Sequence, residues 1–324
     1  MNEDKKLPSG KLSPDALKRS IFPYAGAARP EVLIGPGVGE DAAVIKTPED
    51  KYLIVTSDPI TGATEGAGRS LVRVNSNDIA TKGGDPAYLT VTLILPPKYG
   101  EEGAARLMRE IHEECRAIGA AVIGGHTEFN DLYDRPVIMG TLIGTADKVL
   151  CASDIEEGDL IIVTKEICIE GMAILANDRP NLLSRIMSEE EIAEIRTWAK
   201  KISVLEESRI LRKYAKFMHD PTEGGFLGGL DEICLLSGRS AELDINAVPI
   251  DPLTKRAAEK LGFDPFHLIS SGMLLAAVPE KYAQKALDEL KEAGIAAAVI
   301  GKMGKKTDKP IPEPTEELWR LLKM

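Results

Sequence analysis

Two short runs, KYLIVTS at residues 51–57 and AYLTVTLIL at residues 87–95, decide how the first half of this chain folds. Both are rich in apolar and β-branched side chains and are bounded by Gly, Pro or Asp, which is typical of strands. The residues between them, 69–82 (RSLVRVNSNDIATK), place apolar side chains three and four positions apart, as an amphipathic helix does. The pattern therefore predicts a strand, a helix and a second strand in succession.

The same alternation continues along the chain. Residues 100–118 have helical spacing and place Glu101 and Glu102 in the first turn, where the helix dipole favours acids. The further elements predicted from these signals are strands at residues 120–124, 136–143, 160–164, 273–278 and 296–300, and helices at residues 188–213, 230–236 and 280–293. We therefore expect an α/β or α+β fold.

The length of 324 residues favours two domains of about 150 residues each over one large domain. An acidic turn, EEGD at residues 156–159, follows Cys151 and is the best place for a boundary. We therefore expect one domain over residues 1–150 and a second over residues 151–324.

Composition and charge argue against several classes of protein. The chain is 44% hydrophobic and 28% charged, as ordinary globular proteins are. Its net charge of −11 repels phosphate backbones and anionic membrane surfaces, so nucleic acid is not an expected partner. The longest apolar stretch, residues 88–97, is far shorter than the ~20 residues that span a bilayer, and the first residues lack the apolar block of a secretory signal. We expect a cytoplasmic protein with no membrane segment.

The four cysteines give no sign of a structural metal or a redox motif. They are widely spaced and form no C-x-x-C pair, at Cys115, Cys151, Cys168 and Cys234. We interpret them as small buried hydrophobic residues in a reducing compartment.

The string GPGVGEDAAV at residues 35–44 is the first candidate ligand site. A dinucleotide-binding loop would need a strand before it and a helix after it, and the short β-prone run at residues 42–45 does not fit a helix. A plain glycine turn is the simpler alternative. Against it, Glu40 and Asp41 place oxygen ligands beside the backbone amides around Gly39, which suits an anion together with a metal ion.

Two further carboxylates occupy informative positions. Asp58 follows the strand predicted at residues 51–57, and strand ends face the crevice where α/β proteins bind ligands. A turn residue or a helix cap is the alternative. Asp78 ends the polar run NSND at residues 75–78, which interrupts an apolar helix pattern. Such a run is costly on a helix face that could simply be apolar, although a solvated position is the alternative.

Two glycine-bearing strings complete the set. GGHTE at residues 124–128 directly follows a predicted strand, so its backbone can approach a ligand, and His126 and Glu128 are expected at the same edge as Asp58. HDPTEGG at residues 219–225 leads into an apolar helix pattern, where Thr222 is a candidate cap and glycine amides can seat phosphate. A structural histidine and glycines that serve helix packing are the alternatives.

Two common catalytic motifs are missing from the sequence. It contains neither a G-x-x-x-x-G-K-[ST] string nor an H-E-x-x-H pair. What remains is a set of carboxylates on separate loops, which suits magnesium held through a few oxygens and the phosphates of a substrate.

Taken together, these strings resemble the superfamily that contains aminoimidazole ribonucleotide (AIR) synthetase, selenophosphate synthetase, thiamine monophosphate kinase and the hydrogenase maturation factor HypE, with HypE the most similar. The resemblance covers nearly the whole chain, and the order and spacing of its parts are more specific than any one of them. The parts that carry it are Asp58 after its strand, GEDAAV (39–44), NDIATKGGDPAYL (77–89), GGHTE (124–128), DPTEGG (220–225) and LISSGMLLAAVP (268–279).

The resemblance implies ATP and Mg²⁺ as cofactors, a homodimer formed through a sheet of the amino-terminal domain, and a carboxy-terminal α/β domain that closes over the nucleotide. It implies catalytic roles for Lys11, as a phosphate-contacting residue, and for His126; a solvated leader lysine is the alternative for Lys11. The metal ligands that it implies are Asp41, Asp58, Asp78 and Glu128. The nucleotide-binding residues that it implies are Gly39, Glu40, Asn77, Gly124, Gly125, Thr127, Asp220, Thr222, Gly224 and Gly225.

The activity implied by the resemblance is a HypE-like hydrolysis of ATP, or transfer of its phosphoryl group, that activates an unidentified small-molecule or protein-bound acceptor. The alternatives are a nucleotide-binding maturation partner without turnover and a small-molecule kinase of the thiamine monophosphate kinase type. HypE proteins carry a carboxy-terminal cysteine that receives a carbamoyl group, whereas this sequence ends in ELWRLLKM at residues 317–324. Self-carbamoylation is therefore not expected.

Overall fold

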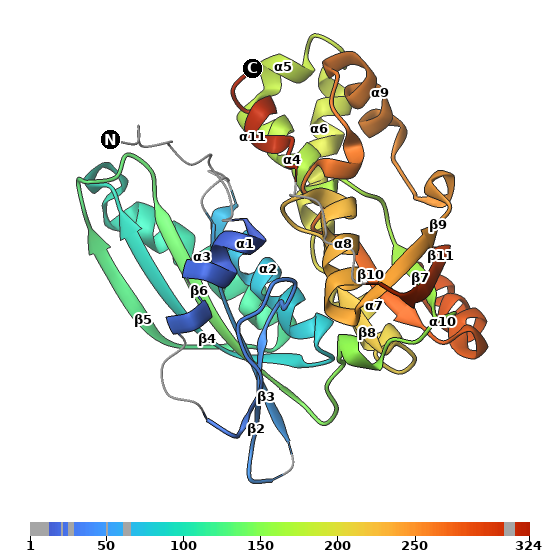
Figure 1. The fold of residues 1–324 in the computed structure, drawn as a ribbon. Helices are drawn as coiled ribbons and strands as arrows, with labels where there is room; N and C mark the ends of the chain where they lie inside the picture. Colours follow the sequence, from blue (N-terminus) through green and yellow to red (C-terminus); the bar gives the residue numbers. More distant parts are fainter. Residues whose placement is uncertain (1–12, 21, 25–28, 50, 61–65, 308–314) are drawn as a thin grey trace, which may run out of the picture.

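The computed structural model describes residues 13–20, 22–24, 29–49, 51–60, 66–307 and 315–324. These residues contain two separate sheets, each packed against helices (Figure 1). The predicted α/β class is confirmed. The first sheet ends at residue 146 and the second begins at residue 160, and the exact domain boundary between them stays a prediction.

The amino-terminal sheet has six strands in the order β1-β2-β3-β6-β4-β5. All neighbours are antiparallel except β4 and β5, which run parallel because helix α3 connects them. The strands are β1 Val32–Ile34, β2 Ala43–Lys46, β3 Tyr52–Ile60, β4 Asp85–Leu95, β5 Ala121–Phe129 and β6 Val137–Ala146.

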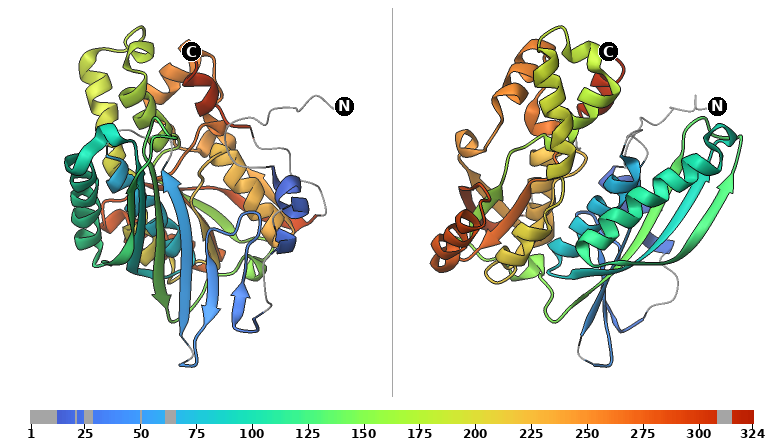
Figure 2. Two further views of the ribbon diagram at one scale, coloured as in Figure 1. Left: turned by 90° about the vertical axis from the view of Figure 1, so that its left-hand side faces the viewer. Right: turned by 180° about the vertical axis from the view of Figure 1, so that it is seen from behind.

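One face of this sheet is covered by helices α2 (Ala67–Thr81) and α3 (Gly100–Ile118). Alternate strand residues such as Ile54, Leu89 and Leu142 point into the core between them and are fully buried. The views in Figures 1 and 2 show that these two helices lie on the side of the sheet that is turned toward the carboxy-terminal part of the chain. A short helix α1 (Pro14–Ser20) and a 3₁₀ turn (Phe22–Tyr24) precede the sheet.

The carboxy-terminal sheet has five antiparallel strands in the order β8-β10-β7-β11-β9. Two apolar cores lie on its two faces, one containing residues of α4, α6, α8, α9 and α11 and the other residues of α7 and α10. The strands are β7 Leu160–Thr164, β8 Phe217–His219, β9 Arg239–Leu243, β10 Leu274–Val278 and β11 Ala297–Lys306. The helices are α4 Ile169–Asp178, α5 Pro180–Leu183, α6 Glu189–Thr197, α7 Leu205–Leu211, α8 Gly225–Ser237, α9 Pro252–Leu261, α10 Glu280–Glu292 and α11 Leu318–Leu321.

The single long helix expected over residues 188–213 is wrong. Helix α6 begins with a capping box of Ser188 and Glu191 and ends at Thr197, and α7 starts only at Leu205. Between them the chain turns inward and its backbone is held by Asn77 of α2, which donates to Ile202 O (3.0 Å) and accepts from Val204 N (2.9 Å). These two hydrogen bonds to α2 hold residues 202–204 in a non-helical conformation, although the sequence around them has helical periodicity.

The strand predicted at residues 120–124 is too short, because β5 continues through GGHTE to Phe129. A register shift opposite Leu89 and Thr90 places Gly125 against Val91 of β4. Gly125 has φ 151°, and a Cβ there would lie 1.9 Å from the carbonyl oxygen of Val91. The glycine therefore allows the pairing with β4 to continue through this point.

The other face of the amino-terminal sheet, which we call the open face, has no helix of the described chain over it. Tyr88 and Met139 are 48% and 40% exposed. The neighbouring edge strand β5 is exposed along its whole length and includes the apolar residues Val122, Ile123 and Phe129. An edge strand with exposed apolar residues is a surface that proteins normally cover.

None of the helices in the described ranges combines the length and the apolar character that crossing a membrane requires.

Candidate functional site

Four aspartates from four separate elements gather where the two sheets meet. Asp41 lies in the loop before β2, Asp58 within β3, Asp78 within α2, and Asp220 directly after β8. Asp78 and Asp220 are 5% and 1% exposed. We call these four residues the carboxylate cluster. Asp58 was expected directly after a strand that ends at Ser57, but it lies inside β3, which continues to Ile60.

Asp78 is the most strongly perturbed member of the cluster. The run at residues 75–78 is buried rather than solvated, so the polar face of α2 is turned into the protein. Thr56 donates a hydrogen bond of 2.6 Å to Asp78 Oδ2. Burial, followed by the nearby charges of Asp58 and Asp220, raises the pKa of Asp78 well above its ordinary value. In the absence of a cation, this carboxylate is therefore unfavourable in its charged form.

Asp220 is buried, and neither of its carboxylate oxygens has a partner in good hydrogen-bond geometry in the described part of the chain, although the side chain of Asn77 lies close enough to lower its pKa. Burial, and then the charge of Asp41, raises its pKa well above the ordinary value. Buried carboxylates are normally paired, hydrogen-bonded or bound to a metal. An oxygen donor pair of this kind fits a hard cation such as Mg²⁺.

Asp41 is held by a histidine that the sequence analysis did not single out. His219 Nδ1 lies 2.7 Å from Asp41 Oδ1, and His219 Nε2 lies 2.8 Å from Glu232 Oε2 of α8. Burial alone would lower the pKa of His219, but the two carboxylates raise it to about 10. Burial alone would raise the pKa of Asp41, and His219 brings it below its ordinary value. The pair is therefore an imidazolium and a carboxylate at neutral pH.

A second buried cation stands beside the cluster. Lys82, at the end of α2, has no exposed surface and forms an ion pair with Glu40. Its Nζ also lies 5.0 Å from the ring centre of Phe217 in β8. Since Glu40 belongs to the loop of Gly39 and Asp41, this pair joins the loop to the end of α2, and Lys82 in turn contacts β8. The carboxylate of Glu40 is therefore already paired with Lys82.

The carboxylate cluster does not by itself form a complete metal cage. Within the described ranges, no three His, Cys, Asp or Glu side chains are arranged so that they could hold a metal ion alone. Magnesium is usually bound through one or two carboxylates, with water and substrate phosphates completing its shell. The oxygens of Asp220, Asp78 and Asp58 fit that requirement, because Asp78 and Asp220 are buried, Asp58 is half-buried, and their like charges lie close together.

The residues of GGHTE lie apart from the cluster within one chain. Asp58 pairs with Gly140 of β6, Gly140 with Val91 of β4, and Val91 with Gly125 of β5. Three strand spacings separate β3 from β5, or about 14 Å. Since β3, β4 and β5 run in the same direction, His126 and Glu128 lie at the same end of the sheet as Asp58, as expected, but strands β6 and β4 separate them from it.

The side chains of β5 are exposed instead. His126 and Glu128 are 64% and 44% exposed, and His126 Nε2 lies 3.2 Å from Glu128 Oε2. The hydrogen bond from His126 lowers the pKa of Glu128. Gly124 and Thr127 lie on the same exposed strand. These residues line the edge of the open face and belong to a surface rather than to a pocket.

The loop DPTEGG leads into α8 as predicted, but one of its amides is already occupied. Gly225, the first residue of α8, has φ 65°, and a Cβ there would lie 2.6 Å from Phe266 O, so this glycine serves close packing. The amide of Gly224 donates to Glu316 Oε2 at 2.8 Å. Glu316 also accepts from Ile269 N and Leu318 N, and its burial raises its pKa to about 7. Thr222 lies in the turn before α8 and accepts from Gly225 N through its carbonyl oxygen.

Sequence reasoning missed Lys82, His219, Glu232 and Glu316. Lys82 and His219 stand inside or next to the strings that carry the resemblance, and their position there was the one available signal. Nothing in the sequence links Glu232 or Glu316 to the cluster, because both come from other parts of the chain. Asn77 bonds the backbone at residues 202 and 204, and its nucleotide-binding role stays a prediction. Lys11 lies outside the described residues.

Comparisons with known protein sequences identify relatives along most of the chain. A putative hydrogenase expression/formation protein of Methanocaldococcus jannaschii is 29% identical over 281 residues, which are 83% of this chain and 82% of the relative. The carbamoyl dehydratase HypE of Azotobacter vinelandii is 26% identical over 271 residues, which are 81% of this chain and 77% of the relative.

Solved structures show the same fold. A hydrogenase maturation protein HypE in complex with ATP superposes with a TM-score of 0.67 at 22% identity, covering 90% of this chain and 83% of that protein. A thiamine monophosphate kinase from Aquifex aeolicus superposes with a TM-score of 0.67 at 19% identity, covering 85% and 92%.

Two family models match consecutive parts of the chain. The amino-terminal domain of the AIR synthase related proteins matches residues 39–146, and the carboxy-terminal domain matches residues 156–310. The first model covers the carboxylates of the amino-terminal sheet and the second covers Asp220. The chain therefore belongs to the AIR synthase related protein family.

Proposed function

We propose that this protein is a HypE-like enzyme that binds ATP with magnesium at the carboxylate cluster and hydrolyses it, or transfers its phosphoryl group to an acceptor. The observation that carries the proposal is the cluster itself, in which buried Asp78 and Asp220 both have a raised pKa and the oxygens of Asp220 lack a partner in good hydrogen-bond geometry within the described residues. Relatives named as carbamoyl dehydratases and selenide, water dikinases support the use of ATP.

Some of these residues would bind the metal, and others keep the carboxylates in position. Asp58, Asp78 and Asp220 would hold the metal, and magnesium bound there supplies positive charge for the phosphates of the nucleotide. Thr56 fixes one oxygen of Asp78, and His219 fixes Asp41 through both of its carboxylate oxygens. These bonds keep the acidic side chains in place before a ligand binds, so little reorganisation is needed on binding.

Calorimetry with magnesium and ATP tests the assignment. Asp58→Asn and Asp78→Asn are each expected to weaken binding at least 100-fold, which corresponds to about 2.7 kcal/mol. Asp288→Asn, on the exposed surface of α10, removes a carboxylate of the same type and is the matched control. If both cluster variants bind magnesium ATP as the parent does, the carboxylate assignment is wrong.

We further propose that the active form is a homodimer that covers the open face. Exposed Tyr88 and Met139 and the edge strand β5 support a sheet-to-sheet contact. Light scattering at micromolar concentration should give twice the chain mass of 35.0 kDa, and Tyr88→Lys with Met139→Lys should reduce it to that mass. A parent protein that scatters as a monomer contradicts this arrangement.

A dimer would also explain why His126 and Glu128 lie far from the cluster in their own chain. In that arrangement β5 of one copy faces the cluster of the other. Mixing an Asp78→Asn dimer with a His126→Ala dimer, under conditions that exchange subunits, should then restore ATP turnover, because one site of each mixed dimer has both parts intact. No recovery in a mixture whose exchange is verified would place both residues in the same chain's site.

The acceptor is not one of the four cysteines present in this sequence. Burial raises the pKa of Cys115 and Cys234 to about 11 and raises that of Cys151 and Cys168 as well, so little thiolate exists at neutral pH. Intact mass spectrometry after incubation with ATP, a carbamoyl-transferase partner and carbamoyl phosphate should find no carbamoyl adduct on any of them. An adduct that later becomes a nitrile would restore self-carbamoylation.

Phosphate release measured with and without candidate acceptors separates an enzyme from a binding partner without turnover.

A further inference from the structure

A cavity lies at the junction of the two sheets. Its volume is about 370 Å³. Lys51 before β3, Lys148 after β6 and Gly83 after α2 form one side, and Arg212 and Lys213 after α7 form the other. No member of the carboxylate cluster lines it. The cavity is therefore built from both halves of the chain.

The lining of this cavity is basic although the protein is acidic. Four cationic side chains line it against two carboxylates, Asp85 and Asp147, whereas the whole chain has a net charge of −11. Asp85 is already paired with two arginines, Arg212 Nη1 at 2.8 Å and Arg209 Nε at 3.0 Å. Positive charge concentrated against the sign of the whole protein marks a place where an anion gains energy.

Two of the lysines are unused by the fold. Lys213 is paired with Glu289 of α10 at 2.8 Å. Lys51 and Lys148, by contrast, form no ion pair with any residue in the described ranges. Their charges do not stabilise a partner inside the protein, so they are free to meet a ligand in the cavity.

We infer that this cavity binds a small phosphate compound, either inorganic phosphate or the phosphate group of a monoester. The two unpaired lysines supply point charges, and the planar guanidinium of Arg212 supplies directed donors at the same cavity. A phosphate dianion matches the charges of these two lysines, which have no ion-pair partner within the described residues. The volume falls within the range of small-molecule pockets, so a monoester with a small organic part fits as well.

An anion at this place would act on the carboxylate cluster through one short connection. Arg212 Nη1 donates at 3.1 Å to the carbonyl oxygen of Gly83, the residue that follows Lys82. Lys82 forms the buried ion pair with Glu40, next to Asp41. A phosphate bound to Arg212 would therefore act on the residue next to Lys82, and so on the ion pair of Lys82 with Glu40.

Thermal unfolding with inorganic phosphate, without magnesium or nucleotide, tests the site. The melting temperature of the parent should rise along a saturating curve, because a ligand that binds only the folded state stabilises it by mass action. The double variant Lys51→Ala, Lys148→Ala should raise the apparent Kd at least tenfold, since neither lysine has a partner whose loss would unfold the protein.

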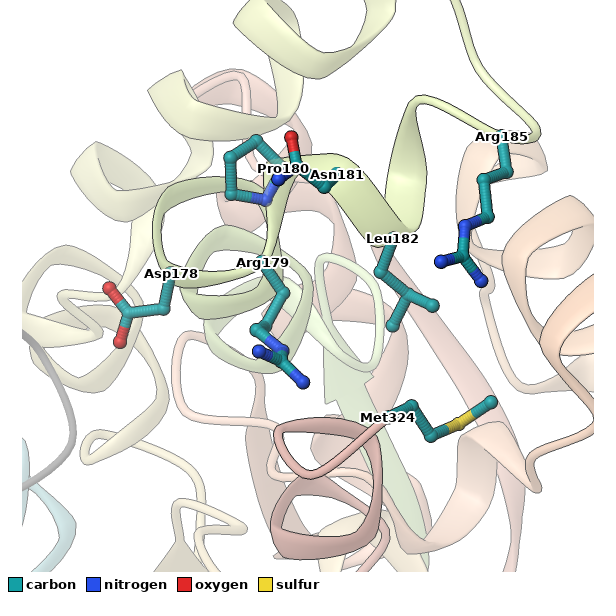
Figure 3. A pocket seen from close by; sticks show the side chains of 7 residues that line it. All are labelled: Asp178, Arg179, Pro180, Asn181, Leu182, Arg185 and Met324. Atoms are coloured by element: carbon teal, nitrogen blue, oxygen red, sulfur yellow. The ribbon is translucent and has the colours of Figure 1, made fainter.

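Two controls separate this site from other sources of the effect. Arg185→Ala removes an arginine from a separate pocket of about 180 Å³, where Figure 3 shows Arg179 and Arg185 on either side of Leu182, and it should leave the curve unchanged. Asp58→Asn should also leave it unchanged, because without magnesium the carboxylates of the cluster do not bind phosphate. A linear rise shared by all variants is general exclusion of phosphate from the surface and would overturn the inference, as would a saturating curve that survives in the double lysine variant.

Discussion

The carboxylate cluster and the edge strand β5 carry sequence strings of the same kind, yet the fold treats them in opposite ways. Asp78 and Asp220 are almost completely buried, with like charges close together, whereas His126 and Glu128 are about half exposed on a strand with one free edge. In the cluster, buried like charges repel one another, and a bound cation would reduce that repulsion. On β5, unpaired backbone groups and exposed apolar side chains form a surface that a partner can cover. Polar residues in similar strings therefore have different roles according to burial alone.

The largest change in stability is expected at Lys82, a buried cation next to the carboxylate cluster. Lys82→Met removes the fully buried cation and leaves Glu40 without its partner, so we expect the free energy of unfolding to fall by about 4 kcal/mol. Denaturant unfolding measures it. The double variant Lys82→Met, Glu40→Gln should recover part of the loss, and equal losses in the single and double variants would show that the ion pair is not the cause.

On the exposed side, the strand itself is the sensitive element. Gly125→Ala places a Cβ 1.9 Å from Val91 O and should cost about 3 kcal/mol, because the pairing of β5 with β4 must shift. Gly124→Ala is the matched control, since a Cβ at the adjacent glycine has nothing within 4 Å. Similar unfolding curves for the two variants would mean that β5 does not pair with β4 through GGHTE.

Glu316 should make the free energy of unfolding depend on pH. Because burial raises the pKa of its carboxyl to about 7, above the ordinary value of 4.5, the folded protein holds this proton more tightly than the unfolded chain does. Its contribution is complete below the unfolded pKa and is lost as the pH rises through about 7. The parent should therefore lose about 2 kcal/mol relative to Glu316→Gln between pH 5 and pH 8. Parallel stability curves for the two proteins in that range would contradict it.

The smallest effect is expected to be a gain. Asp78→Asn removes a charge that burial and its neighbours disfavour, while its amide oxygen can still accept from Thr56. Without ligand, this variant should be more stable than the parent by about 1 kcal/mol, even though it loses magnesium ATP. Thermal unfolding in a chelator measures the gain. A variant less stable than the parent would mean that the charged aspartate is stabilised by contacts within the protein.

The strands and helices with strong periodicity could be predicted from the sequence, whereas elements shaped by contacts could not. The helix at residues 100–118 was predicted with the bounds that α3 has, because its apolar face and the glycine after it are local signals. The break between α6 and α7 and the extension of β5 depend on Asn77 and Val91, which lie far away in the sequence. Local propensity is a weak prior where such contacts compete with it.

For the site, the sequence by itself determined which carboxylates are available and that they stand in loops, strands and a polar helix face. The tertiary structure decided that Asp41, Asp58, Asp78 and Asp220 meet, and that GGHTE lies on a free edge three strands away. It also decided that His219 pairs with Asp41, that Lys82 holds Glu40 beside it, and that Glu316 accepts from the loop that follows Asp220. The physical reason is that charge and periodicity are written locally, whereas burial and pairing arise only when distant segments of the chain pack together.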